Sequence, residues 1–400
     1  MLKKYLKFII MILFVAVFIG TVTALFSKGL HFTQHIKTIS NFNYFLFFLP
    51  FAGLLTLYSY DKIAPNYDKG MGILLDNLDK KSNFLNYKMG ILVFSTTLLA
   101  HLFGASVGRE GVAVQLGGVI GKKNSKFIEE DRGIFSRISM ACGFAGLYQT
   151  PLAAIFFIYE ITKVKEKSKR EKILYFLVGL VATFLSKYTA KFLGAHTFLV
   201  NLKFSYNLIN LNFIFKILFA LICFSFIGIL FVQFTEINKR IFTKLFPNKY
   251  VKIFSVSVVV ALALHYFNGR YMSLGTNLIN ESFSMFYLIK NQDFILKLIF
   301  TSICISIGFQ GGEVTPLFAI GASLGIFLSY FLGIDPLLLA ALGYICVFSS
   351  ATHGYLGSSF IGAEIFGFEY FPIFFISCFI TSRLNFHKNI YGKRIYEVDL

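Results

Sequence analysis

The stretch Gly108-Arg109-Glu110-Gly111-Val112-Ala113-Val114-Gln115 places an ionisable side chain between glycines, at the start of an apolar, helix-like run that reaches Gly118. A second run of this kind follows Gly311-Gly312. It begins with Glu313, 203 residues after Glu110, and it reaches Gly321, which is 203 residues after Gly118. In a soluble protein, a glutamate in the first turn would simply complement the helix dipole. Whether the two glutamates have a further role therefore depends on whether these helices lie in water or in a membrane.

The composition indicates a membrane protein. Of the 400 residues, 56% are hydrophobic and 14% are charged, and the mean hydropathy is +0.68. Soluble domains are nearer to about 45–50% apolar and about 25% charged. Runs 6–26 and 213–234 each contain a single lysine and are long enough to cross a bilayer. We expect run 6–26 to be a retained first helix and not a signal peptide, because its apolar core exceeds the usual length of about 7–15 residues.

The net charge of +18 would suit a nucleic-acid-binding protein, but the placement of the basic residues argues against that partner. They gather in short segments between apolar runs: at the N-terminus, in 163–172, in 239–252 and in 383–394. This distribution is typical of cytoplasmic loops. It predicts a multi-pass protein of the inner membrane with cytoplasmic N- and C-termini. Segment 193–212, whose single lysine is Lys203, is predicted to be external.

Further positions recur at nearly the same offset. Glu364 follows Glu160 by 204 residues, and Gly275 follows Gly70 by 205. The basic loop beside Glu160 places that residue at the inner end of its helix, whereas one apolar run separates Glu364 from the basic residue Arg383. Equivalent residues on opposite sides of the membrane predict inverted-topology repeats, which place a transport site at their interface near the midplane. We expect Glu160 and Glu364 themselves to cap or pair helix ends.

The predicted fold is an all-α polytopic membrane protein made of two inverted-topology repeats with broken helices. We assign the first repeat to 41–195 and the second to 251–400, the latter with a short C-terminal tail. Residues 1–40 are predicted to form an N-terminal helix and linker, and 196–250 a connecting loop and helix.

Segments beginning near Gly70, Gly108 and Gly311 are too short or too rich in glycine to span as single helices. At membrane depth a broken helix must bury its loose backbone in protein or line a cavity. Its first N–H groups then form an anion site from partial charges. A carboxylate at Glu110 would compete with a mobile anion for those groups, and on protonation it would lose its charge and leave. Because ionisable residues at membrane depth are functional by default, we predict that Glu110 is a gate and proton carrier.

At these positions the sequence resembles the CLC family of chloride channels and exchangers. Residues 108–115 resemble the motif GREGPxVQ, and residues 143–160 resemble GxAAxFxAPLAGxxFxxE. The resemblance extends from Gly70 to Tyr391. It implies a CLC-like fold and a homodimer in which each subunit has its own anion pathway.

Departures from the common pattern resemble the fluoride/proton antiporter clade of that family. Met71 stands where most members have the serine of GSGIP, and Glu313-Val314-Thr315 departs from the usual GGxFxP. Ile161 occupies the place of the glutamate that serves proton entry from the inside in many chloride/proton exchangers, and the clade also lacks that glutamate. Leu74 and Asn77 depart from the clade, since some of its members carry aromatic residues at these two positions.

Gating and proton coupling are thus assigned to Glu110. The residues assigned to the anion site are Gly70, Met71, Gly72, Gly108, Arg109, Gly111, Val112, Gly312, Glu313, Val314, Thr315 and Tyr391. Arg109 is expected to be a structural or loop-facing partner within that segment. Three of these residues have a structural alternative: Glu313 as a buried acid with a hydrogen-bond partner, Thr315 as a side chain bonded to backbone, and Tyr391 as an interfacial aromatic.

The predicted function is proton-coupled fluoride export, and the alternative is a chloride/proton exchanger or chloride channel of the same fold. A membrane-embedded enzyme would need a nucleophile or a metal set, which the sequence does not show. A scaffold without substrate would not explain the paired Gly-Glu breaks. The five cysteines are scattered through apolar runs and are expected to serve packing. We expect no cofactor and no metal, and, because nine residues follow Tyr391, no nucleotide regulation.

Overall fold

The computed structural model describes residues 2–39, 42–65, 70–78, 87–128, 131–162, 168–196, 198–200, 202, 210–385 and 389–391. Within these ranges the first half of the chain forms α1 (Leu2–Ile39), η1 (Phe42–Phe48), α2 (Leu49–Ile63), α3 (Met71–Asn77), α4 (Tyr87–Leu102), α5 (Glu110–Asn124), η2 (Ser125–Phe127), α6 (Arg132–Tyr148), α7 (Pro151–Ile161) and α8 (Lys169–Phe192). The second half forms α9 (Leu211–Leu245), α10 (Lys249–Tyr266), α11 (Thr276–Ser284), η3 (Phe286–Leu288), α12 (Asp293–Ile307), α13 (Val314–Leu332), α14 (Pro336–Thr352), α15 (Leu356–Phe366), η4 (Phe368–Tyr370) and α16 (Phe371–Arg383).

Parts of the predicted charge pattern lie outside the described residues. These are the basic residues of 163–167, Lys388, the basic residues beyond 391, and part of the predicted external loop, Lys203 included. In the described part of the chain, five helices have the length and composition to cross a membrane: Lys3–Ile36 within α1, α8, α9, α10 and α13. The protein is therefore a polytopic membrane protein, as predicted.

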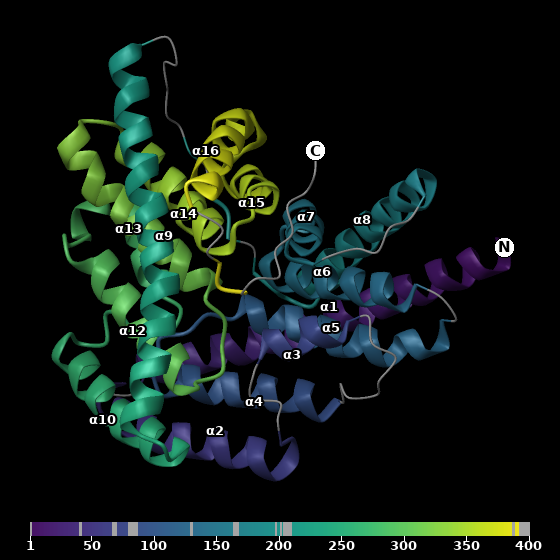
Figure 1. Cartoon of the computed structure of the whole chain (residues 1–400), viewed down its shortest axis with the longest axis horizontal. Helices are drawn as coiled ribbons and strands as arrows, with labels where there is room; N and C mark the ends of the chain where they lie inside the picture. Colours follow the sequence, from purple (N-terminus) through teal and green to yellow (C-terminus); the bar gives the residue numbers. More distant parts are fainter. Residues whose placement is uncertain are drawn as a thin grey trace.

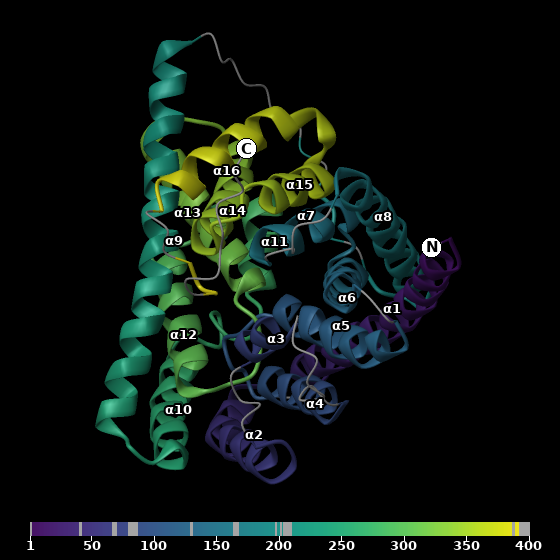
Figure 2. The same ribbon diagram turned by 45° about the vertical axis from the view of Figure 1, so that its right-hand side comes forward.

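The two halves lie side by side. The first half occupies one side of the molecule, and α9 runs along the opposite side with the second half packed beside it (Figure 1). Helices α7 and α15 pack against each other where the halves meet (Figure 2). Several helices are too short to cross a bilayer, among them α3 with 7 residues, α11 with 9, and α7 and α15 with 11 each. Of the segments predicted to be broken, α3 after Gly70 and α5 after Gly108, with 15 residues, are short. The prediction is wrong for the segment after Gly311, because α13 has 19 residues and the length to cross a membrane.

Pairs of equivalent residues touch each other between the halves. Phe156 and Phe360, which are 204 residues apart, stack with ring centroids 4.5 Å apart and an interplanar angle of 4°. Gly108 and Gly312, also 204 apart, form an antiparallel bridge in which each N–H donates to the other residue's carbonyl. Equivalent residues that contact each other must lie beside a twofold axis. The halves are therefore related by an approximate twofold axis, as inverted-topology repeats require.

Glu160 and Glu364 exchange caps across this axis. The Glu160 carboxylate, at the end of α7, accepts the backbone N–H groups of Tyr355, Leu356 and Gly357 at 2.7–2.9 Å, where α15 begins. The Glu364 carboxylate, near the end of α15, accepts those of Leu152 and Ala153 at 3.3 and 2.9 Å, where α7 begins. Each glutamate thus supplies acceptors to N–H groups that a helix start leaves unpaired. The predicted capping role of both residues is confirmed.

Among the described residues, eight α-helices lie before residue 196 and eight after residue 210. The predicted boundaries at 41–195 and 251–400 leave α1 and α9 outside the two repeats. That division remains a prediction.

The helix starts differ in a way that positions the site. Asn210, Asn248 and Asp335 each accept N–H groups of the helix that they precede, which is the usual N-cap arrangement. Arg109 and Glu313, at the N-cap positions of α5 and α13, make no such side-chain cap. The first N–H groups of these two helices can therefore receive an acceptor from elsewhere.

Candidate anion and proton site

The Glu110 carboxylate reaches across the twofold axis to the start of α13. Its Oε1 accepts the Thr315 hydroxyl at 2.5 Å, and its Oε2 accepts the Thr315 backbone N–H at 3.2 Å. Oε2 also accepts the backbone N–H of Arg109 at 3.3 Å, and Oε1 lies 3.4 Å from the Arg109 Nε. The Glu110 side chain is fully buried. A negative group thus occupies donors that belong to a helix start, a hydroxyl and a guanidinium.

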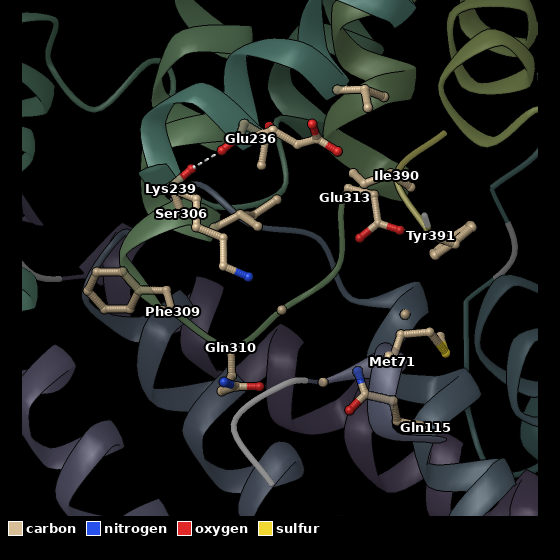
Figure 3. A pocket seen from close by; sticks show the side chains of 18 of the residues that line it. Met71, Gln115, Glu236, Lys239, Ser306, Phe309, Gln310, Glu313, Ile390 and Tyr391 are labelled. Atoms are coloured by element: carbon tan, nitrogen blue, oxygen red, sulfur yellow. Dashed lines mark hydrogen bonds between the residues drawn. The ribbon is translucent and has the colours of Figure 1, made fainter. Parts of the chain in front are cut away.

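A cavity of about 370 Å³ lies on one side of this carboxylate. We call it the Met71 cavity. It is lined by Gly70, Met71, Gly72, Leu75, Gly111, Gln115, Val232, Thr235, Glu236, Lys239, Ile305, Ser306, Gly308, Phe309, Gln310, Gly311, Glu313, Ile390 and Tyr391. Figure 3 shows Glu313, Ile390 and Tyr391 on one side of the cavity and Phe309 and Gln310 on another. The Tyr391 hydroxyl donates to Glu313 Oε1 at 2.7 Å.

A smaller cavity of about 200 Å³ lies on the other side, and we call it the Arg109 cavity. It is lined by His31, Gln34, Arg109, Tyr148, His196, Phe198, Leu274, Thr276, Ile279, Asn280, Thr315 and Tyr344. Arg109 and Thr315 line this cavity, whereas their neighbours Gly111 and Glu313 line the Met71 cavity. Glu110 therefore lies between the two cavities, and no residue lines both of them.

The structure brings most of the assigned anion-site residues together around Glu110. Gly70, Met71, Gly72, Gly111, Glu313 and Tyr391 line the Met71 cavity, and Arg109 and Thr315 line the Arg109 cavity. Gly108 and Gly312 form the bridge that joins the two loops. An added Cβ at Gly108 would lie 2.7 Å from the Gly312 carbonyl oxygen, so only glycine fits there. The side chains of Val112 and Val314 are buried in apolar clusters, which leaves only their backbone for the site.

Sequence reasoning did not assign several residues that line the cavities. Gln115, which is 4% exposed, faces the Met71 cavity, and its Oε1 has no hydrogen-bond partner among the described residues. A lone amide in an apolar helix was the available signal, because burying an amide without a partner is costly. Tyr148 and Tyr344 share a hydrogen bond between their hydroxyls in the Arg109 cavity. No spacing in the sequence links these two tyrosines.

Two inverted halves, helix starts that converge from both, and a buried carboxylate between two cavities define a membrane protein that moves small ions. The profile of the voltage gated chloride channel family matches residues 51–385. This chain belongs to that family, the CLC family.

Known relatives place it more closely. The chain is 31% identical over 389 residues to a protein of Pseudomonas syringae pv. tomato named chloride/fluoride channel protein, with 94% of this chain and 84% of that relative covered. Among solved structures, the crystal structure of a CLC-type fluoride/proton antiporter is similar with a TM-score of 0.92 and 35% identity, over 98% of this chain and 99% of that chain. A slow cyanobacterial Cl⁻/H⁺ antiporter shares the fold with a TM-score of 0.81 and 16% identity, over 95% and 94% of the two chains.

Proposed function

We propose that this protein exports fluoride in exchange for protons. The observation that carries the proposal is the Glu110 carboxylate, which rests on the Thr315 N–H and hydroxyl between two cavities. A small anion that replaced the carboxylate would bind the same two donors. The similar proteins named above support fluoride as the anion, since one is named a chloride/fluoride channel protein and another a fluoride/proton antiporter.

In the proposed cycle, the Glu110 carboxylate and a fluoride ion bind the same Thr315 donors in turn. When Glu110 is charged, its oxygens hold the Thr315 donors and separate the two cavities. When Glu110 takes up a proton, its attraction to those donors falls, the side chain leaves, and a fluoride takes its place. Fluoride is a hard, strongly hydrated anion, so converging N–H and O–H donors must offset its dehydration. Backbone and hydroxyl dipoles can do so and still release the ion.

Met71 supports fluoride over chloride in this scheme. Its thioether lines the Met71 cavity at the start of α3, at a position where it brings no hydroxyl donor. The first-turn N–H groups of α3 receive no side-chain cap. Most members of the family carry a serine at this position, so the methionine resembles the fluoride/proton antiporter clade and not the chloride exchangers.

We further propose that the Met71 cavity opens to the cytoplasm and the Arg109 cavity to the outside. Lys239 lines the Met71 cavity near the end of α9. The same end of α9 carries Arg240 and Lys244, and Lys249 begins α10. Basic residues gather on the cytoplasmic side of membrane proteins. This orientation puts both termini in the cytoplasm, with the protein in the inner membrane. We also propose a homodimer with a separate pathway in each subunit.

The test uses purified protein in lipid vesicles with a fluoride gradient and no other driving force. We expect the fluoride gradient to move protons through the wild-type protein, and we expect Glu110→Gln to abolish this movement because an amide cannot cycle its charge. Glu369→Gln, the same change at an exposed residue, is the matched control and should behave as wild type. Proton movement that survives in Glu110→Gln would refute the assignment. Chloride efflux as fast as fluoride efflux would favour the chloride alternative instead.

A further inference from the structure

A lysine is fully buried beside the loop that leads to the gate. Lys297, on α12, has 0% of its surface exposed. Its ammonium donates to the Ser106 hydroxyl at 2.9 Å, the Tyr271 carbonyl at 3.1 Å and the Ser273 carbonyl at 2.7 Å. All three N–H donors of the ammonium are thus matched by oxygens. A charge at membrane depth is expensive to keep, so such residues are retained where the charge has a use.

The contacts of Lys297 continue to the gate through two short loops. Ser273 lies 2.7 Å from the Nδ1 of His101, and the Nε2 of His101 lies 3.3 Å from the Gly108 carbonyl. A carbonyl only accepts, so Nε2 carries a proton. When the ring is neutral, Nδ1 accepts from the Ser273 hydroxyl, and the positive charge of this network belongs to Lys297. The network ends at Gly108, two residues before Glu110 and directly at the bridge between the halves.

The acidic groups nearby are engaged on the other side of the lysine. Asp293, one turn before Lys297 on α12, binds Arg270 at 2.5 Å and the Tyr271 hydroxyl at 2.8 Å. Glu281 binds the same arginine at 2.7 Å. Around Lys297 the described titratable and charged groups on neighbouring elements are therefore His101, Arg270, Tyr271, Glu281, Asp293 and Cys304. Because the two acids bind Arg270 and the ammonium binds the gate loop, the positive end of this cluster faces the gate.

The equivalent place in the first half has no charge. The residue 204 positions before Lys297 is Val93, which is fully buried in an apolar cluster. Gly70, at the start of α3, faces the open Met71 cavity. Its counterpart Gly275, at the start of α11, instead lies against the lysine, since a Cβ there would meet the Lys297 Cε at 2.7 Å. The lysine thus fills in one half the space that remains open in the other.

We propose that Lys297 is a positioning residue for the gate: its fixed charge, tied to the loop before Glu110, favours negative charge in the anion site. The negative charge can belong to the Glu110 carboxylate or to the anion that replaces it. This inference rests on the proposed gating function of Glu110. Without the lysine, Glu110 takes up a proton more readily and a bound anion is held less well.

The test is the pH dependence of anion flux in vesicles for two matched pairs of variants. Lys297→Met removes the charge, and Lys297→Arg keeps it. Ser106→Asp places a carboxylate against the ammonium and neutralises it, and Ser106→Asn is a neutral variant of the same size. We expect Lys297→Met and Ser106→Asp to move the alkaline midpoint of flux upward by about half a pH unit. The shift is smaller than the ~1–3 units of a direct ion pair because the lysine acts through the intervening loop.

The partners of each pair separate charge from packing. Lys297→Arg and Ser106→Asn should keep the wild-type midpoint, even where their rates fall. The proposal is overturned if folded Lys297→Met and Ser106→Asp keep the wild-type midpoint, or if the charge-conserving variants shift as much. It is also overturned if only the neutralised variants fail to fold, since the lysine would then serve the fold. If the wild type moves an anion without coupled protons, the proposed antiport fails, but the midpoints of anion flux still decide the role of Lys297.

Discussion

The two halves carry two pairs of glutamates, 203 and 204 residues apart, and the pairs differ in symmetry. Glu160 and Glu364 make the same kind of contact, each capping the short helix of the other half. Glu110 and Glu313 do not. Glu110 crosses the axis to Thr315, whereas Glu313 turns to Tyr391 in the Met71 cavity. The difference teaches that contacts which keep the twofold symmetry hold the halves together, while the contacts that break it lie in the proposed transport path.

The break in symmetry gives the two cavities different surroundings. A symmetric pair of carboxylates at the axis would present the same group to both cavities. With Glu110 on the start of α13 and Glu313 beside Tyr391, each cavity has its own lining. Variants that affect one pair and not the other therefore test this comparison.

The largest effect is expected on stability, from the symmetric pair. Glu160→Gln removes the charge from an acceptor of three backbone N–H groups, and hydrogen bonds to charged groups contribute about 1.5–3 kcal/mol. We expect a loss of roughly 2 kcal/mol for Glu160→Gln and somewhat less for Glu364→Gln, which loses a carboxylate that accepts two N–H groups. Thermal unfolding in detergent measures the destabilisation of both variants. The readout is the temperature at which half of the monodisperse protein is lost.

Glu369→Gln, the same change at an exposed residue, is the control and should keep the unfolding temperature of the wild type. The comparison fails if Glu160→Gln unfolds like wild type, or if Glu369→Gln is destabilised as much as the cap variants.

A smaller effect is expected from the Glu313 and Tyr391 pair. Tyr391→Phe removes the hydroxyl that donates to Glu313 at 2.7 Å and leaves a buried acid without that partner. Losing such a charge-assisted bond costs about 1.5 kcal/mol, so we expect fluoride flux to fall roughly tenfold. The proton-to-fluoride ratio should not change, since Glu110 still carries the proton. A changed ratio in flux assays would mean that Glu313 shares the coupling role and that the pair is less divided than the contacts indicate.

Much of the fold could be predicted from the sequence because glycines and glutamates mark the helix starts. The nearly constant offset between Glu110 and Glu313 and between Glu160 and Glu364 predicted two related halves. The capping role of Glu160 and Glu364 followed from their places at helix ends. Proline and glycine positions are local signals, and local signals are readable without a structure.

The rest depended on contacts between distant segments. No pattern in the sequence joins Tyr148 to Tyr344, or Lys297 to Ser106 and the loop before the gate. These residues meet only because α6 lies beside α14, and α12 beside the loop before α5. Packing between segments about 190 residues apart leaves no periodicity. The sequence likewise could not predict which of the two cavities each residue lines, because that depends on how the cavities are closed.

The smallest effect is expected at the first residues of α3 and α11, which are also equivalent by position. Met71 lines the Met71 cavity, and Thr276, which follows it by 205 residues, lines the Arg109 cavity. Met71→Ser restores a hydroxyl at the end where a dehydrated anion enters, and one added neutral hydrogen bond contributes about 1 kcal/mol. We expect the ratio of fluoride to chloride flux to fall about fivefold, chiefly through faster chloride flux. Thr276→Ser keeps a hydroxyl at the equivalent position and should leave the ratio unchanged. A Met71→Ser protein with the wild-type ratio would show that selectivity is set at Thr315 and the start of α13, and that the difference between α3 and α11 belongs to packing alone.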